Sequence, residues 1–258
     1  MNTVQVKGLI LGEGIPKICV PVTGRTKEEI LQNLSALKQA KPDMAEWRAD
    51  WYEDVLEDGK LTEIISLLKD ELGELPLLVT FRTRGEGGEQ EISPRDYEQF
   101  LRRVLASGKA DVLDVELFMG EELLREIVKE AHKSNVKILA SSHDFTKTPK
   151  KEEMIQRLCR MQDLGADLLK IAVMPQNAED VLTLLQMTWE MNQGLARQPV
   201  ITMSMGGTGV ISRLSGEVFG SALTFALAGQ ASAPGQIEVA RLKEVLKVIH
   251  DSRLSGIK

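Results

Sequence analysis

The chain has 258 residues, of which 43% are hydrophobic and 27% are charged, a composition that allows a globular protein to bury a large core. Its formal net charge of −6 argues against broad binding to nucleic acids or anionic membranes, since both need a basic surface. No stretch approaches the roughly 18 apolar residues of a membrane span, and the N-terminus shows no apolar segment of signal-peptide length. We therefore expect a cytoplasmic protein with no nucleic-acid or membrane partner. Cys19 and Cys159 lie far apart and are expected to be reduced and packed.

Short β-rich runs alternate along the chain with stretches of helical periodicity. The predicted strands cover residues 17–22, 44–50, 77–82, 112–118, 137–142, 168–173, 199–205 and 218–225. The predicted helices cover residues 27–38, 61–72, 94–106, 121–132, 151–164 and 178–192. Thr26 and Ser93 are expected to begin helices, and Gly73, Gly108 and Gly165 to end them.

This alternation favours a (β/α)8 TIM barrel over a doubly wound parallel sheet. A dinucleotide-binding sheet would carry a GxGxxG turn after its first strand, and residues 19–25 supply none. The first sixteen residues are predicted to form a short β-hairpin that closes the N-terminal end of the barrel. Residues 1–258 are thus expected to form one catalytic domain.

One charged residue, Lys170, interrupts a strand that is otherwise apolar. Burying an ammonium group costs several kcal/mol unless the group is paired or loses its proton. Desolvation lowers the pKa of a lysine, and a neutral amine can attack a ketone or an aldehyde. Lys170 is therefore a candidate Schiff-base nucleophile. The alternatives are a lysine paired with a core carboxylate and a lysine that reaches solvent.

Polar residues gather where the predicted strands end, which is where active sites form in such barrels. They are Glu46, Arg48, Arg82, Glu86, Asp114, Glu116, His143, Lys170 and Arg213. Any one of them alone would more often form a structural ion pair. Their concentration at one end of one predicted barrel indicates a site.

His143 directly follows a predicted strand, whereas His132 and His250 fall on predicted helices and are expected to be solvated. Imidazole suits proton transfer near neutral pH, and an iminium on Lys170 would draw electrons from the neighbouring carbon as its proton leaves. Glu86 is a candidate to orient that imidazole. No His, Cys, Asp or Glu cluster has metal-ligand spacing, so no metal is expected and the lysine would do the work of one.

Several segments, in order along the chain, closely resemble type I 3-dehydroquinate dehydratase. They are Glu46-Trp47-Arg48-Ala49-Asp50, Thr80-Phe81-Arg82 with Glu86-Gly87-Gly88-Glu89, Asp114-Val115-Glu116-Leu117-Phe118, Ser142-His143-Asp144-Phe145, Leu169-Lys170-Ile171-Ala172, Thr202-Met203-Ser204-Met205, Gly209-Val210-Ile211-Ser212-Arg213 and Ser232-Ala233-Pro234-Gly235-Gln236. The resemblance implies a (β/α)8 barrel, usually a homodimer, that dehydrates 3-dehydroquinate to 3-dehydroshikimate in the shikimate pathway of aromatic amino acid biosynthesis. It also implies syn elimination without a metal or cofactor.

The resemblance assigns roles to individual residues. Lys170 matches the imine-forming lysine, His143 the general acid and base, and Glu86 the carboxylate paired with that histidine. Arg213 matches the arginine that holds the substrate carboxylate. The remaining matches are Glu46, Arg48 and Arg82 on the ring hydroxyls, Ser232 and Gln236 in a loop that closes over the substrate, and Met203, Met205 and Phe145 as apolar walls.

Two other functions remain open from the residues. A class I aldolase would use the same barrel and a Schiff-base lysine, and residues 206–209 resemble a phosphate-binding turn. Against it, Arg213 and the segment 232–236 fit a carboxylated cyclohexanone better. A non-catalytic barrel that binds a small acid would keep Arg213 but would have no need of Lys170 or His143.

Overall fold

The computed structural model describes residues 2–229 and 232–255, and it contains one parallel sheet of eight strands in the order β10-β3-β4-β5-β6-β7-β8-β9. The strands are β3 (Lys17–Val22), β4 (Met44–Arg48), β5 (Leu77–Thr80), β6 (Val112–Glu116), β7 (Lys137–Asp144), β8 (Leu168–Val173), β9 (Val200–Ser204) and β10 (Leu223–Phe225). The last gap is bridged just before β10, where the Ala222 N–H donates to the Val200 carbonyl at 2.8 Å. The predicted (β/α)8 barrel is confirmed.

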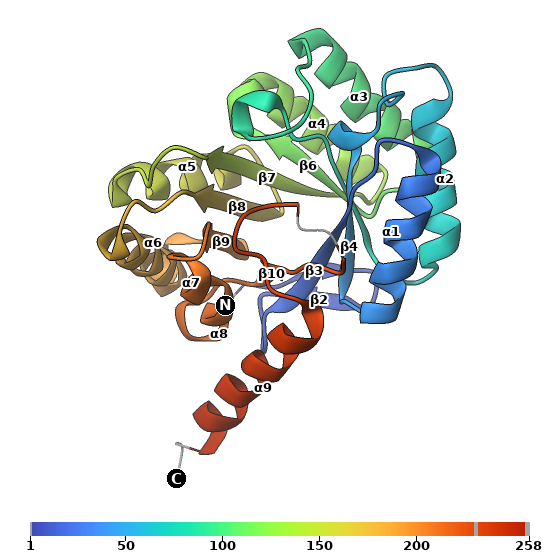
Figure 1. The fold of residues 1–258 in the computed structure, drawn as a ribbon. Coiled ribbons are helices and arrows are strands. Elements are labelled where there is room, and N and C mark those ends of the chain that lie inside the picture. Colours follow the sequence, from blue (N-terminus) through green and yellow to red (C-terminus); the bar gives the residue numbers. More distant parts are fainter. Residues whose placement is uncertain (1, 230–231, 256–258) are drawn as a thin grey trace.

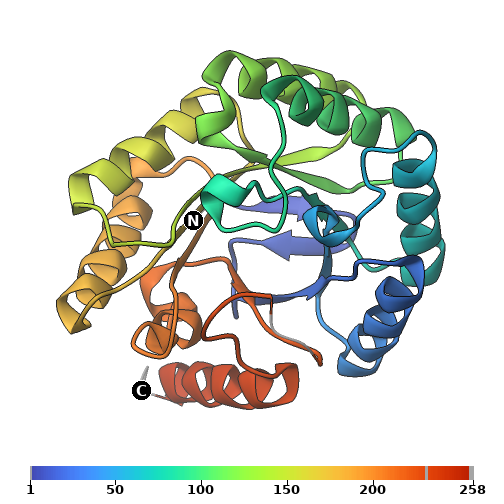
Figure 2. The same ribbon diagram turned by 45° about the horizontal axis from the view of Figure 1, so that its top comes forward.

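Helices surround the sheet, one after most of its strands (Figures 1 and 2). They are α1 (Lys27–Ala40), α2 (Lys60–Leu72), α3 (Pro94–Ser107), α4 (Glu121–Lys133), α5 (Lys151–Asp163), α6 (Ala178–Glu190), α7 (Val210–Leu214), α8 (Gly216–Phe219) and α9 (Val239–Ser255). Short helical turns η1 (Ala49–Trp51), η2 (Arg84–Glu86), η3 (Leu117–Met119) and η4 (Met191–Leu195) lie between these elements. None of the helices within residues 2–229 and 232–255 has the length and apolar run that a bilayer crossing requires.

Local capping explains where the helices begin. The Thr26 hydroxyl accepts a hydrogen bond from the Glu29 N–H at 3.3 Å, and the Ser93 hydroxyl accepts one from the Asp96 N–H at 3.1 Å. The strand predicted over 218–225 is wrong in its first part, because 216–219 form α8. Gly220, with φ of +101°, ends that helix, so within the predicted range only Leu223–Phe225 form a strand, preceded by a single bridge between Ser221 and Val200.

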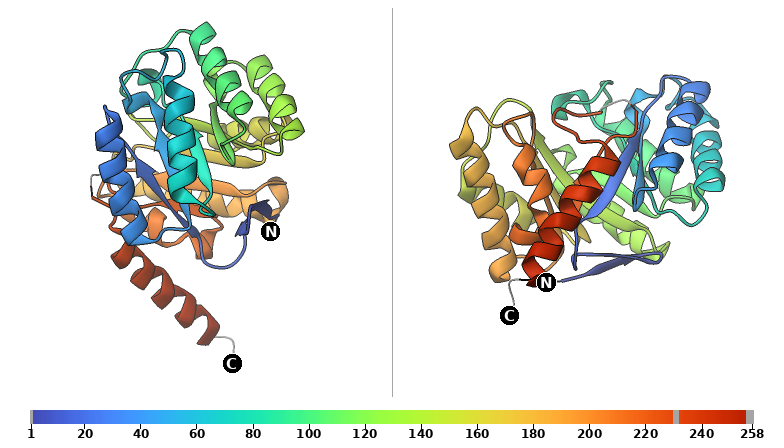
Figure 3. Two further views of the ribbon diagram at one scale, coloured as in Figure 1. Left: turned by 90° about the vertical axis from the view of Figure 1, so that its right-hand side faces the viewer. Right: turned by 60° about the horizontal axis from the view of Figure 1, so that its bottom comes forward.

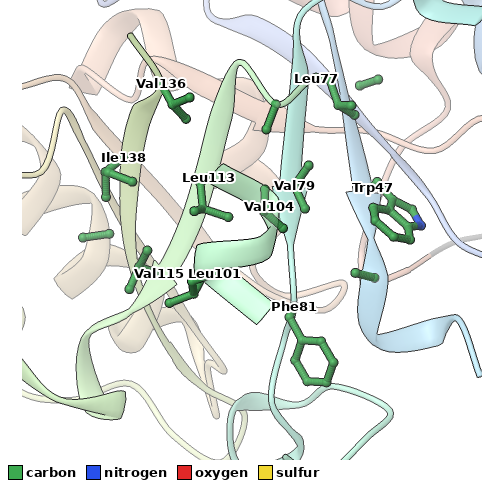
Figure 4. Packing of buried hydrophobic residues seen from close by; sticks show 14 of the residues in the cluster. Trp47, Leu77, Val79, Phe81, Leu101, Val104, Leu113, Val115, Val136 and Ile138 are labelled. Atoms are coloured by element: carbon green, nitrogen blue, oxygen red, sulfur yellow. The ribbon is translucent and has the colours of Figure 1, made fainter. Parts of the chain in front are cut away.

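Residues on each strand alternate between the helix layer and the barrel interior, and this alternation determines which side chains can reach a site. In Figure 4, Leu113 and Val115 of β6 lie with Val79 of β5 against Leu101 and Val104 of α3. The other three residues of β6, which are Val112, Asp114 and Glu116, point into the barrel. The outer face therefore supplies most of the core, which leaves the interior free to hold charge.

A hairpin of β1 (Val4–Val6) and β2 (Leu9–Leu11) lies across the N-terminal end of the barrel (Figure 3). Val4, Val6 and Leu11 are buried there against apolar side chains of the barrel interior. The interior at this end is lined by Met44, Leu78, Val112, Leu139, Leu168 and Ile201. The predicted hairpin is confirmed, and the polar residues lie toward the opposite end.

Candidate active site

A pocket of about 480 Å³ lies at the C-terminal ends of the strands. It is lined by Glu46, Arg48, Arg82, Glu86, Gly87, His143, Phe145, Lys170, Ala172, Met203, Met205, Arg213, Phe225, Ser232, Ala233 and Gln236. This set contains every residue that the sequence predicted for catalysis or substrate binding. The structure therefore brings all of these residues to one place.

Strand register explains the convergence. Glu46 and Arg48 are two residues apart on β4 and thus share a face, as predicted. On the neighbouring strands β7 and β8, Ser141 pairs with Lys170 and His143 pairs with Ala172. His143 consequently lies two residues nearer the C-terminal end of the barrel than Lys170 does, on the adjacent strand.

Lys170 is buried, with a relative exposure of 5%. Its Nζ atom lies 4.3 Å from the centre of the Phe225 ring and 4.0 Å from Asp114 Oδ2. Within residues 2–229 and 232–255, no acceptor is hydrogen-bonded to Nζ, and Asp114 is the one carboxylate within 4.0 Å. Burial lowers the pKa of Lys170, while the negative charges of Glu46 and Asp114 oppose this change. The amine thus makes no hydrogen bond with the described residues, and its burial favours the neutral, nucleophilic form.

His143 and Glu86 form a hydrogen-bonded pair beside the lysine. The His143 Nδ1 atom and backbone N–H lie 2.9 and 3.0 Å from the same oxygen, Glu86 Oε2. Burial raises the pKa of Glu86 to about 8, although the nearby Arg82 opposes the rise. Burial, together with the charges of Arg82 and Lys170, lowers the pKa of His143 well below its usual value. When the pair loses its proton, an Nδ1–H can donate to ionised Glu86, which leaves Nε2 free to accept a proton.

Arg82 holds three carboxylates around itself. Its Nη2 donates to Asp114 at 2.8 Å, and its Nη1 lies 2.8 Å from Glu116, 3.0 Å from the Ser141 hydroxyl and 3.4 Å from Glu86. A buried guanidinium that spans several carboxylates fixes their mutual geometry because its donors are planar. Arg82 lines the pocket as predicted and also organises the charged floor beneath it.

Arg48 and Glu46 are held by partners that the sequence analysis did not assign to the site. Arg48 donates to both oxygens of Asp50, each at 2.7 Å, and the Thr80 hydroxyl donates to Glu46 at 2.8 Å. Asp50 also accepts the backbone N–H groups of Arg82 and Glu89. These contacts restrict the rotamers of side chains that face the pocket.

Arg213 is the pocket's unpaired cation. It is 3% exposed, no carboxylate in the described ranges lies within ion-pair distance, and its Nε atom has no partner there. Its Nη2 donates to the Pro234 carbonyl at 3.0 Å and its Nη1 to the Phe225 carbonyl at 3.4 Å. Burial without a counter-ion lowers the pKa of Arg213 to about 10. An anion in the pocket would supply the missing charge.

Residues 232–236, here called the lid segment, cover this arginine. The Ser232 N–H donates to Gln236 Oε1 at 2.9 Å, and Gln236 Nε2 donates to the Ser232 hydroxyl at 3.1 Å. The Gly206 N–H donates to the Pro234 carbonyl at 3.2 Å. Gly235 has φ of +76°, and a Cβ atom there would lie 2.4 Å from the Gly206 carbonyl oxygen. The lid segment is therefore seated against the loop after β9.

Sequence reasoning missed several residues of the site. Asp114 was noted on its strand but given no role, and Phe225 was not considered. Both are inward-facing residues on barrel strands, so alternation along the strand was the available signal. Gly87 also lines the pocket, and a side chain is excluded there because a Cβ atom would lie 2.2 Å from the Phe145 ring.

The other histidines and both cysteines lie outside the pocket. His132 contacts Asp167 at 2.9 Å and His250 contacts Glu217 at 2.8 Å. Cys19 and Cys159 are free thiols. Among the residues that the structure describes, no group of three or more His, Cys, Asp or Glu side chains is placed to hold a metal ion.

The fold and pocket together define a (β/α)8 barrel with a buried lysine and a histidine–carboxylate pair at its mouth. Residues 18–253 match the family described as type I 3-dehydroquinase, and the chain belongs to this family. It is 54% identical over 250 residues to the 3-dehydroquinate dehydratase of Clostridioides difficile, covering 96% of this chain and 98% of that one. It is 51% identical to that of Syntrophotalea carbinolica, covering 97% and 99%.

Solved structures agree with these matches. The type I 3-dehydroquinate dehydratase of Clostridium difficile, solved with covalent modified comenic acid, has a TM-score of 0.94 at 52% identity and covers 98% of this chain and 100% of its own. The 3-dehydroquinate dehydratase of Geobacillus kaustophilus has a TM-score of 0.94 at 35% identity, covering 97% of each chain.

Proposed function

We propose that this protein dehydrates 3-dehydroquinate to 3-dehydroshikimate, in the shikimate pathway, through a Schiff base on Lys170. The observation that carries the proposal is the Lys170 amine, which is buried in a pocket and makes no hydrogen bond with the described residues. Such an amine has little to contribute to stability and much to contribute to attack on a ketone. The relatives' common name supplies the substrate.

The reaction divides among the residues as follows. Arg213 binds the substrate carboxylate, and neutral Lys170 attacks the C3 ketone to give a carbinolamine. With one proton taken up from solvent, the carbinolamine loses its oxygen as water, which leaves an iminium. His143 removes a C2 proton, and the C–H electrons move toward the nitrogen to give an enamine. The enamine electrons then return and expel the C1 hydroxyl, which leaves as water with the proton held by His143. Water hydrolyses the conjugated iminium, which frees the product and Lys170.

The remaining pocket residues take positioning roles in this proposal. Glu46, Arg48 and Arg82 contact the ring hydroxyls, Met203, Met205 and Phe145 provide apolar walls, and Ser232 and Gln236 close over the ring. Assembly as a homodimer belongs to the same proposal, and light scattering coupled to size exclusion tests it directly.

Borohydride reduction tests the central step. After the protein is mixed with 3-dehydroquinate and sodium borohydride, intact mass and peptide mapping should show one adduct on the peptide that contains Lys170. Lys170→Ala should lose both adduct and turnover while keeping the circular dichroism spectrum of the fold. Turnover without an adduct in the unsubstituted protein would contradict the imine.

The aldolase alternative receives less support from the geometry. The Gly206 N–H, which a phosphate would need, already donates to the Pro234 carbonyl of the lid segment. An absorbance assay for the conjugated product separates the two reactions, because retro-aldol cleavage gives no conjugated ring acid.

A further inference from the structure

Asp114 lies close to the reactive amine but outside the pocket. Its carboxylate is completely buried, at 0% exposure, and it does not line the pocket, although Oδ2 lies 4.0 Å from Lys170 Nζ. A ligand in the pocket cannot touch it. Any effect of Asp114 on the reaction must therefore pass through Lys170 or through Arg82, which lines the pocket and donates to Asp114.

Two hydrogen bonds fix Asp114 in this position. Arg82 Nη2 donates to Oδ2 at 2.8 Å, and the Ser141 hydroxyl donates to Oδ1 at 2.8 Å. Ser141 is the register partner of Lys170 on β8 and of Glu116 on β6, so its hydrogen bond to Asp114 reaches back two residues along β6. The carboxylate cannot turn away from the lysine without breaking both bonds.

Glu116 provides an internal comparison two residues along the same strand. It receives Arg82 Nη1 at 2.8 Å, which matches the distance from Arg82 to Asp114. Its other contacts are the backbone N–H and hydroxyl of Thr83, and it lies beyond 4.0 Å from Lys170. If the carboxylates served only to neutralise Arg82, both would be equivalent. Only Asp114 is also placed against the amine.

A carboxylate beside a nucleophilic lysine is unhelpful for the first step, since it favours the ammonium form. It is useful at the next step, where the same nitrogen must be cationic to draw electrons from the substrate. Resting on the function proposed above, we infer that Asp114 is the counter-ion of the Lys170 iminium and acts as a positioning residue that keeps the imine nitrogen protonated.

The other groups around Lys170 fit this assignment. The Phe225 ring of β10 lies 4.3 Å from Nζ and presents its face to the positive charge. The charge of Glu46 on β4 raises the pKa of Lys170 more than that of Asp114 does, but Glu46 lines the pocket and is available to a ligand. The remaining groups near Lys170 are Cys19 on β3, Arg82 after β5 and His143 on β7. Asp114 is thus the carboxylate near the nitrogen that does not line the pocket, so it stays available to the nitrogen when a ligand is bound.

The pH dependence of kcat tests the inference, because kcat reports groups in the substrate complex. At alkaline pH, kcat falls as the imine nitrogen loses its proton. In Asp114→Asn this alkaline limb of the profile should move to lower pH by about one to three pH units. Glu116→Gln removes a carboxylate from the same arginine and should leave that limb where it is. Equal shifts in the two variants, or none in either, would overturn the inference.

A direct readout separates the imine from His143, which also titrates in the complex. With Nζ-15N lysine in His143→Ala, the imine formed from 3-dehydroquinate should show the nitrogen shift of a protonated iminium from pH 6 to 9. Adding Asp114→Asn should make that nitrogen titrate within the range. A neutral imine at pH 7 with Asp114 present would refute the inference, even if the Asp114 variants fail to fold. Absence of a Lys170 adduct in the unsubstituted protein would instead reject the proposed function.

Discussion

His143 and Glu86 are joined twice, since one carboxylate oxygen, Oε2, lies 2.9 Å from the imidazole Nδ1 and 3.0 Å from the His143 backbone nitrogen. The backbone contact fixes the carboxylate to the strand end, and the ring contact then fixes the imidazole to the carboxylate. The other Glu86 oxygen, Oε1, is buried and has no partner among the described residues. The imidazole is thus oriented without being given a second competing acceptor.

His143→Ala is expected to reduce kcat by about 100-fold or more, because a positioned acid and base is lost while the lysine remains. The imine should still form and should accumulate, so borohydride should trap more adduct than in the unsubstituted protein. Rapid turnover by this variant would contradict the assignment. His132→Ala, which removes a histidine on α4 away from the pocket, serves as the control and should behave like the unsubstituted protein.

Glu86→Gln is expected to change how stability depends on pH. The pKa of Glu86 is raised from an ordinary value of 4.5 to about 8, so its contribution to folding is greatest at low pH and is lost as pH rises through about 8. Glutamine cannot lose this proton. The free energy of unfolding of the variant, relative to the unsubstituted protein, should therefore rise between pH 5 and 8, by up to about 1.4 kcal/mol per pH unit.

Chemical denaturation at several pH values measures this difference. Glu91→Gln changes an exposed carboxylate that follows the same loop and contacts only Arg84, at 3.6 Å, among the described residues. Its difference from the unsubstituted protein should stay nearly constant over the same range. A constant difference for Glu86→Gln as well would show that burial of Glu86 carries no such penalty.

Arg213→Met is expected to weaken substrate binding without lowering stability. A buried cation without a carboxylate partner costs desolvation energy, and methionine removes that cost while filling similar space. KM should rise strongly and Tm should stay level or rise. Arg48→Met makes the contrasting case, because it leaves Asp50 buried without the partner that now binds it at 2.7 Å, and should cost about 3 to 5 kcal/mol. A similar fall in Tm for both variants would contradict this distinction.

Gly235→Ala is expected to prevent the lid segment from seating. Its positive φ disfavours any side chain, and the new Cβ would lie 2.4 Å from the Gly206 carbonyl oxygen. KM should rise and kcat should fall, with Tm almost unchanged, because the lid segment lies on the surface. Gly207→Ala is the control, since a Cβ there meets nothing within 4 Å. Equal changes of KM and kcat in both variants would show that the effect does not arise from seating of the lid segment.

The strands and their inward residues were accessible from sequence because alternation along a strand is a local property. The strands over 17–22 and 168–173 have the predicted bounds. The error at 218–225 has a physical reason, since a short apolar run fits either a strand or a helix, and Gly220 divided it. The outward apolar residues follow the same local pattern and form the core.

Properties that depend on neighbouring strands could not be derived from the residues alone. Register pairing aligns Glu116, Ser141 and Lys170 across β6, β7 and β8, yet the carboxylate that lies 4.0 Å from the lysine amine is that of Asp114. That Arg213 has no carboxylate partner in the described residues is likewise a fact about three-dimensional surroundings. The sequence shows a charge, but only the fold shows whether the charge is compensated.

The hairpin at the N-terminal end of the barrel restricts how a ligand can enter and leave the pocket. Val4, Val6 and Leu11 pack against the apolar interior at the N-terminal end, so the described residues close that end of the barrel and leave the pocket at the opposite end. Each ligand must leave by the route through which it arrived, past the lid segment, before another can follow. We therefore expect opening of the lid segment to limit how fast one ligand can replace another.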